Sequence, residues 1–154
     1  MKNCYLFHTG LKYTDVTYHI SKFPLPKNFE AKLLFTSVDW VRTGICFNPD
    51  IVKDQTDANC PQFDVYCILE DLVQFYTKNL GWKNCFPKGA RPLKAGDYMT
   101  ITLKNGEMRY AVNDLDLGSV IKIDMVQKKD MYLFVHTRNI KSRAEIVYIC
   151  EILN

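Results

Sequence analysis

The sequence predicts an all-β protein, folded as an antiparallel β-sandwich. The first observation is a β-hairpin between Gly96 and Gly118, in which apolar and polar residues alternate along both arms. The second is a series of about eight to eleven short β-prone runs at regular spacing, which is typical of sandwiches. The third is an aromatic content of 13%, with nine Tyr and nine Phe, which weakly favours strands. The length of 154 residues predicts one domain, residues 1–154, with a sizeable core.

Four β-prone runs precede residue 50. Phe23-Pro24-Leu25-Pro26 separates the second run from the third, and we expect an extended surface connection there. Residues 36–39 form a tight connection between the third run and the fourth, which ends at Asn48-Pro49-Asp50 because proline cannot donate to a ladder. Residues 50–62 are polar and predict an exposed loop. The four runs are Cys4–Phe7, Val16–Ile20, Ala31–Phe35 and Trp40–Phe47.

The segment 64–80 has two interpretations. Its apolar residues follow helical spacing, with Asp64 as a candidate N-cap and Gly81 as a candidate stop, and periodicity alone slightly favours this helix. The same residues also fit two strands, 65–69 and 73–77, that fold back at Glu70-Asp71. The following stretch, residues 81–95, contains two prolines and two glycines and is predicted to be a loop.

The hairpin is the clearest local feature of the chain. Asn105-Gly106 is a strong signal for a two-residue type I′ turn, because both central residues need a positive φ. Such a turn fixes the register, so that one face is polar and places Lys104 opposite Glu107. The other face is apolar or aromatic and is predicted to enter the core: Met99, Ile101, Leu103, Met108, Tyr110 and Val112.

Three apolar runs and a basic segment follow the hairpin. The runs are Val120–Ile123, Met131–Val135 and Ile146–Leu153, and the last has the nearly unbroken apolar pattern of a buried strand. The segment 136–143 between the last two is polar and basic. We find no internal repeat, low-complexity tract or linker in the sequence.

Composition narrows the function classes. The net charge of +3 is mild and scattered, so nucleic acid is not an expected partner. No apolar stretch has the length of a membrane span, and no membrane association is expected. The six cysteines form no Cys-x-x-Cys or Cys/His motif, so no metal or other cofactor is expected. The N-terminal residues lack a signal-peptide pattern, which predicts a cytoplasmic protein with reduced, mostly buried thiols.

The stretch 96–118 resembles the signature of SPRY (B30.2-like) domains. Gly96-Asp97 enters a strand, a hairpin follows, and a segment with Val112-Asn113 and Leu117-Gly118 leads the chain out of it. Trp40–Ile45, Met131–Val135 and Ile146–Ile149 match other strands of the family more loosely, so that the likeness spans residues 31–152. The resemblance implies a jelly-roll or concanavalin-like sandwich, and two strands in place of a helix over 64–80. We expect structural roles for Asn113, Asp114 and Gly118, with Asn113 bonding its own loop and Gly118 at positive φ.

The resemblance also implies a function. SPRY-like domains generally bind proteins, which predicts a monomeric, non-catalytic module for a protein or peptide ligand, such as an adaptor or substrate-recognition unit of a ubiquitin ligase. Loops 50–62, 79–95 and 136–144 are the candidate contact segments. Their aromatic and basic side chains are of types common in binding hot spots. The candidate partner-binding residues are Trp82, Phe86, Arg91, Arg138, Lys141 and Arg143.

Two alternatives carry less weight. The sequence singles out no residues for catalysis. The three histidines lie in or beside β-prone runs, and Asp114 and Asp116 fit a solvated turn better than a catalytic pair. A galectin-like carbohydrate-binding sandwich is suggested by Cys46-Phe47-Asn48-Pro49, which resembles the His-Phe-Asn-Pro-Arg strand of that family. Here Cys46 replaces the histidine and Asp50 replaces the arginine, so the polar groups that would hold a sugar are missing.

Overall fold

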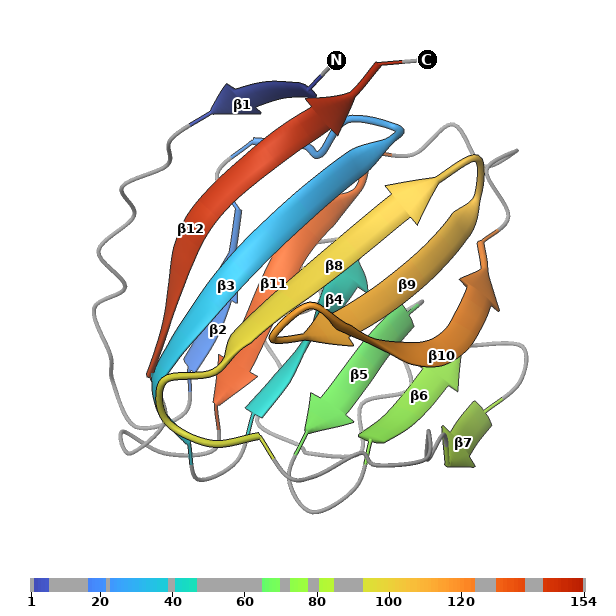
Figure 1. The fold of residues 1–154 in the computed structure, drawn as a ribbon. Helices are drawn as coiled ribbons and strands as arrows, with labels where there is room; N and C mark the ends of the chain where they lie inside the picture. Colours follow the sequence, from blue (N-terminus) through green and yellow to red (C-terminus); the bar gives the residue numbers. More distant parts are fainter. Residues whose placement is uncertain are drawn as a thin grey trace.

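The computed structural model describes residues 2–5, 17–21, 23–38, 41–46, 65–69, 73–77, 81–84, 93–123, 130–137 and 143–153. In this part of the chain every regular element is a strand, and the strands form two six-stranded antiparallel sheets that face each other (Figure 1). The strands are β1 (Lys2–Tyr5), β2 (Thr17–Ile20), β3 (Phe29–Ser37), β4 (Val41–Cys46), β5 (Val65–Leu69), β6 (Val73–Thr77), β7 (Gly81–Asn84), β8 (Tyr98–Lys104), β9 (Glu107–Val112), β10 (Leu115–Lys122), β11 (Tyr132–Thr137) and β12 (Arg143–Ile152).

The chain passes repeatedly between the two sheets. Sheet A has the order β1-β12-β3-β8-β9-β10, and sheet B has the order β2-β11-β4-β5-β6-β7. Both terminal strands lie in sheet A, where β1 pairs antiparallel with β12. The predicted all-β sandwich is therefore confirmed. Among the described residues, no helix is long and apolar enough to cross a membrane.

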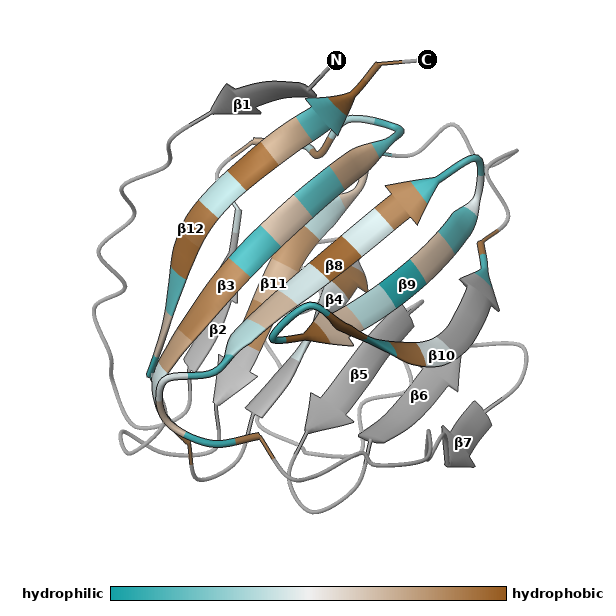
Figure 2. Ribbon diagram, in the orientation of Figure 1, coloured by the Kyte–Doolittle hydropathy of each residue, from teal (hydrophilic) through white to brown (hydrophobic). Residues whose placement is uncertain are grey.

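The predicted hairpin is confirmed residue by residue. Ladder pairs run from Lys104 opposite Glu107 to Met99 opposite Val112, and the turn residues Asn105 and Gly106 have φ of 52° and 77°. The predicted apolar face is buried, except that Val112 is half-buried at its end. Figure 2 shows the hydropathy alternating along β8 and along the neighbouring β3, as expected for strands with one face toward a core.

The core lies between the inner faces of the two sheets. Sheet A contributes large apolar side chains from β3, β8 and β9, and sheet B contributes others from β4 and β11. Burying each of these side chains stabilises the fold by about 1.5–3 kcal/mol. The fully buried members include Phe29, Leu33, Phe35, Ile45, Met99, Ile101, Leu103 and Met108.

One polar contact crosses this core. The hydroxyl of Tyr110 on β9 donates to the carbonyl oxygen of Thr43 on β4 at 3.3 Å. The hydroxyl of Thr43 in turn donates to the carbonyl oxygen of Phe134 on β11 at 2.9 Å. Thr43 is fully buried, and a buried hydroxyl without a partner would destabilise the fold. These two bonds therefore link sheet A to two strands of sheet B.

The segment 64–80 consists of strands. β5 pairs with both β4 and β6, so it is an interior strand, and β6 runs antiparallel to it with Val65 opposite Thr77. Periodicity alone cannot tell a short apolar run such as Val65–Leu69 from part of a helix, and the pairing of β5 with β4 and β6 decides for strands. The prediction of a continuous loop over 81–95 was wrong at its start, because Gly81–Asn84 forms β7 on β6.

The prediction of reduced thiols was wrong for Cys150. This cysteine on β12 is disulfide-bonded, and its side chain is only 1% exposed. Sequence reasoning had relied on the lack of a signal-peptide pattern in the N-terminal residues. That feature does not tell which cysteines a sheet brings together.

Candidate functional site

The strand ladders place the connections at two opposite ends of the sandwich. We call one the signature end: it carries Ser37, Leu93–Tyr98, Val112–Leu115 and Arg143 (lower left in Figure 1). At the opposite end, Asn105 and Ile152 both donate backbone N–H bonds to Asn28, one to its side-chain oxygen and one to its carbonyl oxygen. The amide of Ile123 donates to the carbonyl oxygen of Gly106 there at 2.8 Å.

Asp97 organises the signature end. Its side chain is only 2% exposed, and its two carboxylate oxygens accept from the Lys94 amide and from the Asn113 side-chain amide, both at 2.8 Å. The Asn113 side-chain oxygen accepts from the Tyr98 amide at 2.9 Å. The backbone of Asp97 and Gly96 continues the ladder to Phe35 on β3. The Gly-Asp and Asn elements of the signature therefore hold the start of β8 to the end of β9 and have a structural role.

Asn113 fulfils its predicted structural role in a different way. It was expected to bond its own loop, but its side chain joins Asp97 and Tyr98, at the start of the first strand of the hairpin. Asn113 and Asp114 also form a second two-residue turn, with φ of 48° and 65°, between β9 and β10. Positive φ at both central residues is the mark of a type I′ turn, and Asn and Asp tolerate it better than most residues.

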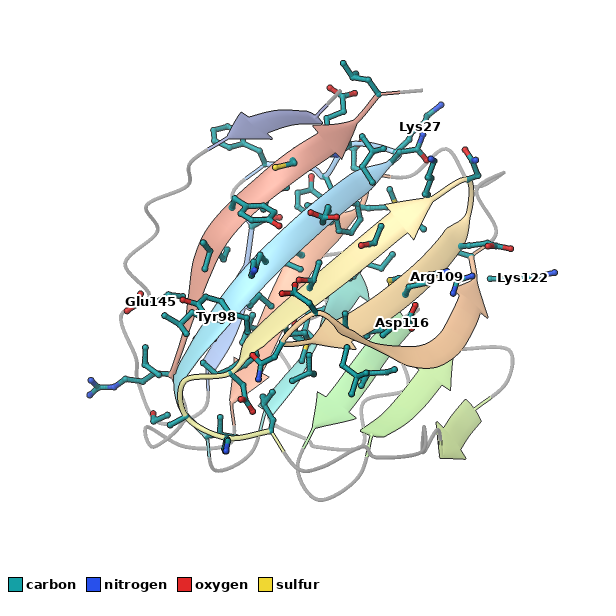
Figure 3. All side chains as sticks on the ribbon, viewed as in Figure 1. Lys27, Tyr98, Arg109, Asp116, Lys122 and Glu145 are labelled. Atoms are coloured by element: carbon teal, nitrogen blue, oxygen red, sulfur yellow. The ribbon has the colours of Figure 1, made fainter. Side chains whose placement is uncertain are left out.

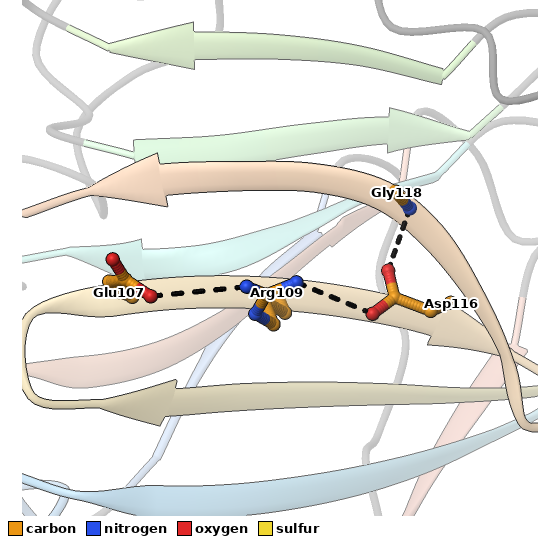
Figure 4. A network of polar contacts seen from close by, with 4 residues as sticks. All are labelled: Glu107, Arg109, Asp116 and Gly118. Carbon is orange, nitrogen blue, oxygen red and sulfur yellow. Dashed lines mark hydrogen bonds and ion pairs between the residues drawn. The ribbon is translucent and has the colours of Figure 1, made fainter.

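β10 contains a bulge next to a short chain of charges. Its register against β9 shifts between Asp116 and Val120, and Gly118 within the bulge has the predicted positive φ, at 73°. The Asp116 carboxylate accepts the Gly118 amide at 2.7 Å (Figure 4). It also lies 3.6 Å from the Arg109 guanidinium, which is 3.9 Å from the Glu107 carboxylate. All three charged side chains are about half-exposed, so the ion pairs contribute little compared with the turn bond.

The outer face of sheet A, which is the face turned away from the core, carries two tyrosines. The Tyr148 hydroxyl donates to the Glu30 carboxylate at 2.9 Å. Burial, this hydrogen bond and the negative charges of Glu30 and Asp114 raise the pKa of Tyr148 to about 12. The Lys32 ammonium lies 4.9 Å from the centre of the Tyr98 ring, which is cation–π geometry. Figure 3 shows Tyr98 and Glu145 toward the signature end and Lys27 toward the opposite end.

Exposed large hydrophobic side chains occur at both ends. Tyr98 (38% exposed) and Leu115 (57%) flank the Asn113-Asp114 turn at the signature end. Phe23 and Leu153 are exposed at the opposite end, near the start of β11 and after the last residue of β12. Single exposed side chains of this kind are normal on protein surfaces, and contiguous apolar patches mark interfaces.

The described residues place two of the six predicted binding residues. Arg143 is exposed and begins β12 at the signature end, opposite Ser37 on β3. Trp82 lies on β7, the edge strand of sheet B, opposite Tyr76. The structure thus assigns them to different sheets. Phe86, Arg91, Arg138 and Lys141 lie outside the described residues, and their roles stay predictions.

The strands that flank the three predicted contact loops show at which end of the sandwich each loop leaves and enters the sheets. Loop 136–144 joins β11 to β12, and Thr137 and Arg143 both lie at the signature end, next to the β3–β4 connection. The connection from β7 to β8 also leaves and enters at this end, at Asn84 and Leu93. Loop 50–62 leaves β4 at Cys46 and enters β5 at Val65, at the opposite end. The topology thus brings the strand ends flanking loop 136–144 and those flanking residues 85–92, the later part of loop 79–95, to one end.

Sequence reasoning missed Tyr98 and Leu115. Tyr98 directly follows Gly96-Asp97, and Leu115 follows the Asn113-Asp114 turn; both lie in the stretch that resembles a family signature, and neither was given a role of its own. The signal that was present is the alternation itself, because Tyr98 precedes the core residue Met99 and must point to the other face. Among the residues described, no group of three His, Cys, Asp or Glu side chains lies together as metal ligands would.

The architecture defines the class of the molecule: it is an antiparallel β-sandwich of the jelly-roll type found in SPRY, galectin and glucanase structures. No protein-family model matches the sequence, and no curated protein is significantly similar to it. The likeness is therefore one of structure.

Three solved structures illustrate it. The SPRY domain of human HERC1 superposes with a TM-score of 0.55 at 10% identity, covering 92% of this chain and 84% of that one. A tetrameric galectin from the ball sponge Cinachyrella sp. gives 0.53 at 6% identity, covering 88% and 100%. A β-glucanase of Bacillus licheniformis gives 0.51 at 9% identity, covering 89% and 71%. These likenesses confirm the fold and do not decide among functions, because one fold carries many.

Proposed function

We propose that this chain is a non-catalytic interaction module that binds a protein or peptide partner at its signature end. The observation that carries the proposal is that the strand ends flanking residues 85–92 and loop 136–144 lie at this end, whereas β6, which precedes loop 79–95, ends at the opposite end. The exposed Tyr98 and Leu115 lie at the signature end. Loops held by a rigid sandwich around apolar anchors form a common kind of recognition surface.

The composition of this end supports a protein partner. Lys94 and Arg143 contribute exposed positive charge at this end, and Asp114 and Glu145 contribute exposed negative charge. Charges of both signs beside exposed apolar side chains are compatible with a protein partner. As a finer proposal, the module serves as an adaptor or substrate-recognition unit in a larger assembly, for example in a ubiquitin ligase.

The non-catalytic character is part of the proposal and rests on how the described carboxylates are engaged. Asp97 is buried and holds the Lys94 amide and Asn113, and Asp116 holds the Gly118 amide. Glu30 accepts from Tyr148. A glycosidase needs two carboxyl groups free to act on one bond. Asp97, Asp116 and Glu30 are instead engaged in hydrogen bonds within the fold, which supports a structural role for each.

Carbohydrate binding is the second candidate, favoured by the outer face of sheet A. Tyr98 and Tyr148 share this face with Thr100 and Thr102, and sugars are held by aromatic rings together with hydrogen-bonding groups. The Tyr148 hydroxyl, however, is already bonded to Glu30. The face therefore supports a sugar site less well than the signature end supports a protein site.

The test is quantitative capture from a lysate of the source organism, with mass spectrometry of what is retained. We expect a partner retained by the wild type to be lost by Tyr98→Ala/Leu115→Ala and kept by the matched control Phe23→Ala/Leu153→Ala. The predicted pair Trp82→Ala/Arg91→Ala is expected to lose it as well, with little change in Tm. Binding that survives Tyr98→Ala/Leu115→Ala, or specific hits on a glycan array without protein capture, would overturn the proposal.

A further inference from the structure

The edge of sheet A beyond β12 is covered by the four residues of β1. The register places Lys2 opposite Ile152, Asn3 opposite Glu151, Cys4 opposite Cys150 and Tyr5 opposite Ile149. β12 is the longest described strand, and without β1 the backbone groups of its last residues would form an open edge. An open edge is prone to pair with other chains, so a short strand of this kind needs something to hold it in place.

Cys150 on β12 is placed to hold β1 in position. Its sulfur is in a disulfide, and its side chain is buried outside the inter-sheet core cluster. On β3 the residue opposite Cys150 is Glu30, which points to the outer face of sheet A and binds Tyr148 there. Cys150 therefore lies on the outer face, on the side of the sheet away from sheet B.

We propose that Cys150 is bonded to Cys4, and that this disulfide is a covalent clasp that holds β1 on the edge of sheet A. Directly opposed residues of antiparallel strands have Cα atoms about 4.5–5.5 Å apart. That separation falls within the range of about 4.4–6.8 Å that disulfides require. Two of the other cysteines, Cys46 and Cys67, are on β4 and β5 of sheet B, so β1 is the strand whose register fits.

The clasp forms by thiol–disulfide exchange with an oxidant of the disulfide class, such as glutathione disulfide. One cysteine thiolate attacks the oxidant, forms a mixed disulfide and releases one thiol. The second cysteine thiolate then attacks the protein sulfur of that mixed disulfide and releases the second thiol. The two protein thiols are oxidised and the oxidant is reduced to two thiols, which carry the two protons. Because disulfides are rare in the cytosol, an intact clasp in native protein would contradict both the cytoplasmic location predicted from the sequence and the ubiquitin-ligase role.

The first test maps the bond in native protein. Cells are quenched in acid, free thiols are alkylated, and the purified chain is digested without reduction. We expect a peptide pair that joins Cys4 to Cys150. Alkylation of both residues, or a link from Cys150 to another cysteine, would overturn the proposal.

The second test measures what the clasp does, in the purified full chain. Reduction with a dithiol is expected to lower Tm by about 5–15 °C and to speed amide exchange at residues 149–152. Cys4→Ser is expected to show the lower Tm without reductant and no further fall with it, and residues 144–146 of β12 serve as the internal exchange control. A reductant effect that is equal in Cys4→Ser and wild type would contradict the clasp, and it would leave the proposed binding at the signature end unaffected.

Discussion

The side-chain amide of Asn113 donates a hydrogen bond to the buried carboxylate of Asp97 at 2.8 Å, across the mouth of the hairpin. The same asparagine accepts from the Tyr98 amide, so one side chain ties the residue before β8 and the first residue of β8 to the turn after β9. We predict that Asn113→Ala destabilises the protein by about 2–3 kcal/mol, because the buried Asp97 carboxylate loses one hydrogen-bond donor and alanine tolerates a φ of 48° less well than asparagine. Chemical denaturation measures the change.

The control for this prediction is Asp114→Asn at the neighbouring turn position. Asp114 is exposed, and asparagine tolerates its φ of 65°, so we expect a change of no more than about 0.5 kcal/mol. Equal losses for the two variants would mean that the turn, and not the bond to Asp97, determines stability here.

The Asn105-Gly106 turn makes a second prediction. Gly106 has φ of 77°, where a β-branched residue is strained. Gly106→Val should therefore lower the free energy of unfolding by about 1–3 kcal/mol. Gly106→Asn is the matched variant and should cost clearly less, since asparagine accepts this conformation. Thermal unfolding of both variants tests the explanation, which fails if valine and asparagine destabilise equally.

The Tyr148–Glu30 hydrogen bond predicts a pH dependence. The pKa of Tyr148 is raised to about 12 in the folded state, from an ordinary value of 10.0. The folded state thus favours the protonated hydroxyl, so the stabilisation is complete below pH 10 and is lost as the pH rises toward 12. Because the side chain is only partly buried, we expect about 1 kcal/mol from this effect.

Tyr148→Phe isolates this effect from the titration of lysines. The variant should be less stable than wild type at pH 8, and the difference in unfolding free energy should shrink between pH 10 and pH 12. A difference that stays constant over this range would show that the hydroxyl is not bound as described.

The bulge in β10 allows the contribution of a turn hydrogen bond to stability to be compared with that of surface ion pairs. Asp116→Ala removes the acceptor of the Gly118 amide, and we expect a loss of about 1 kcal/mol. Arg109→Ala removes only two half-exposed ion pairs at 3.6 Å and 3.9 Å, and its effect should stay below about 0.5 kcal/mol and fade at high salt. A larger loss for Arg109→Ala would contradict this ranking.

The sequence was most informative where local chemistry determines structure. Asn105-Gly106 requires positive φ, and the alternation on both sides then fixes every ladder pair of the hairpin. The segment 64–80 was ambiguous because its apolar residues fit both helical and strand spacing, and the pairing of β5 with β4 that decides between them is long-range. The edge strand β7 was missed because four residues carry too little pattern to identify a strand.

The site was less predictable than the fold. Which loops share an end follows from the strand order across both sheets, and no local pattern contains that order. Cys4 and Cys150 lie at opposite ends of the sequence and become neighbours only because β1 pairs with β12. Tyr98 was overlooked because it lies next to Gly96 and Asp97, which have structural roles.

A hydrogen-exchange footprint of the bound partner tests the central claim most directly. Exchange is measured with the full chain alone and with the captured partner at saturation. Binding at the signature end predicts slower exchange over residues 93–98 and 112–116, with no change at 104–107 and 28–29. Protection confined to 104–107 and 28–29 would place the partner at the opposite end and contradict the account.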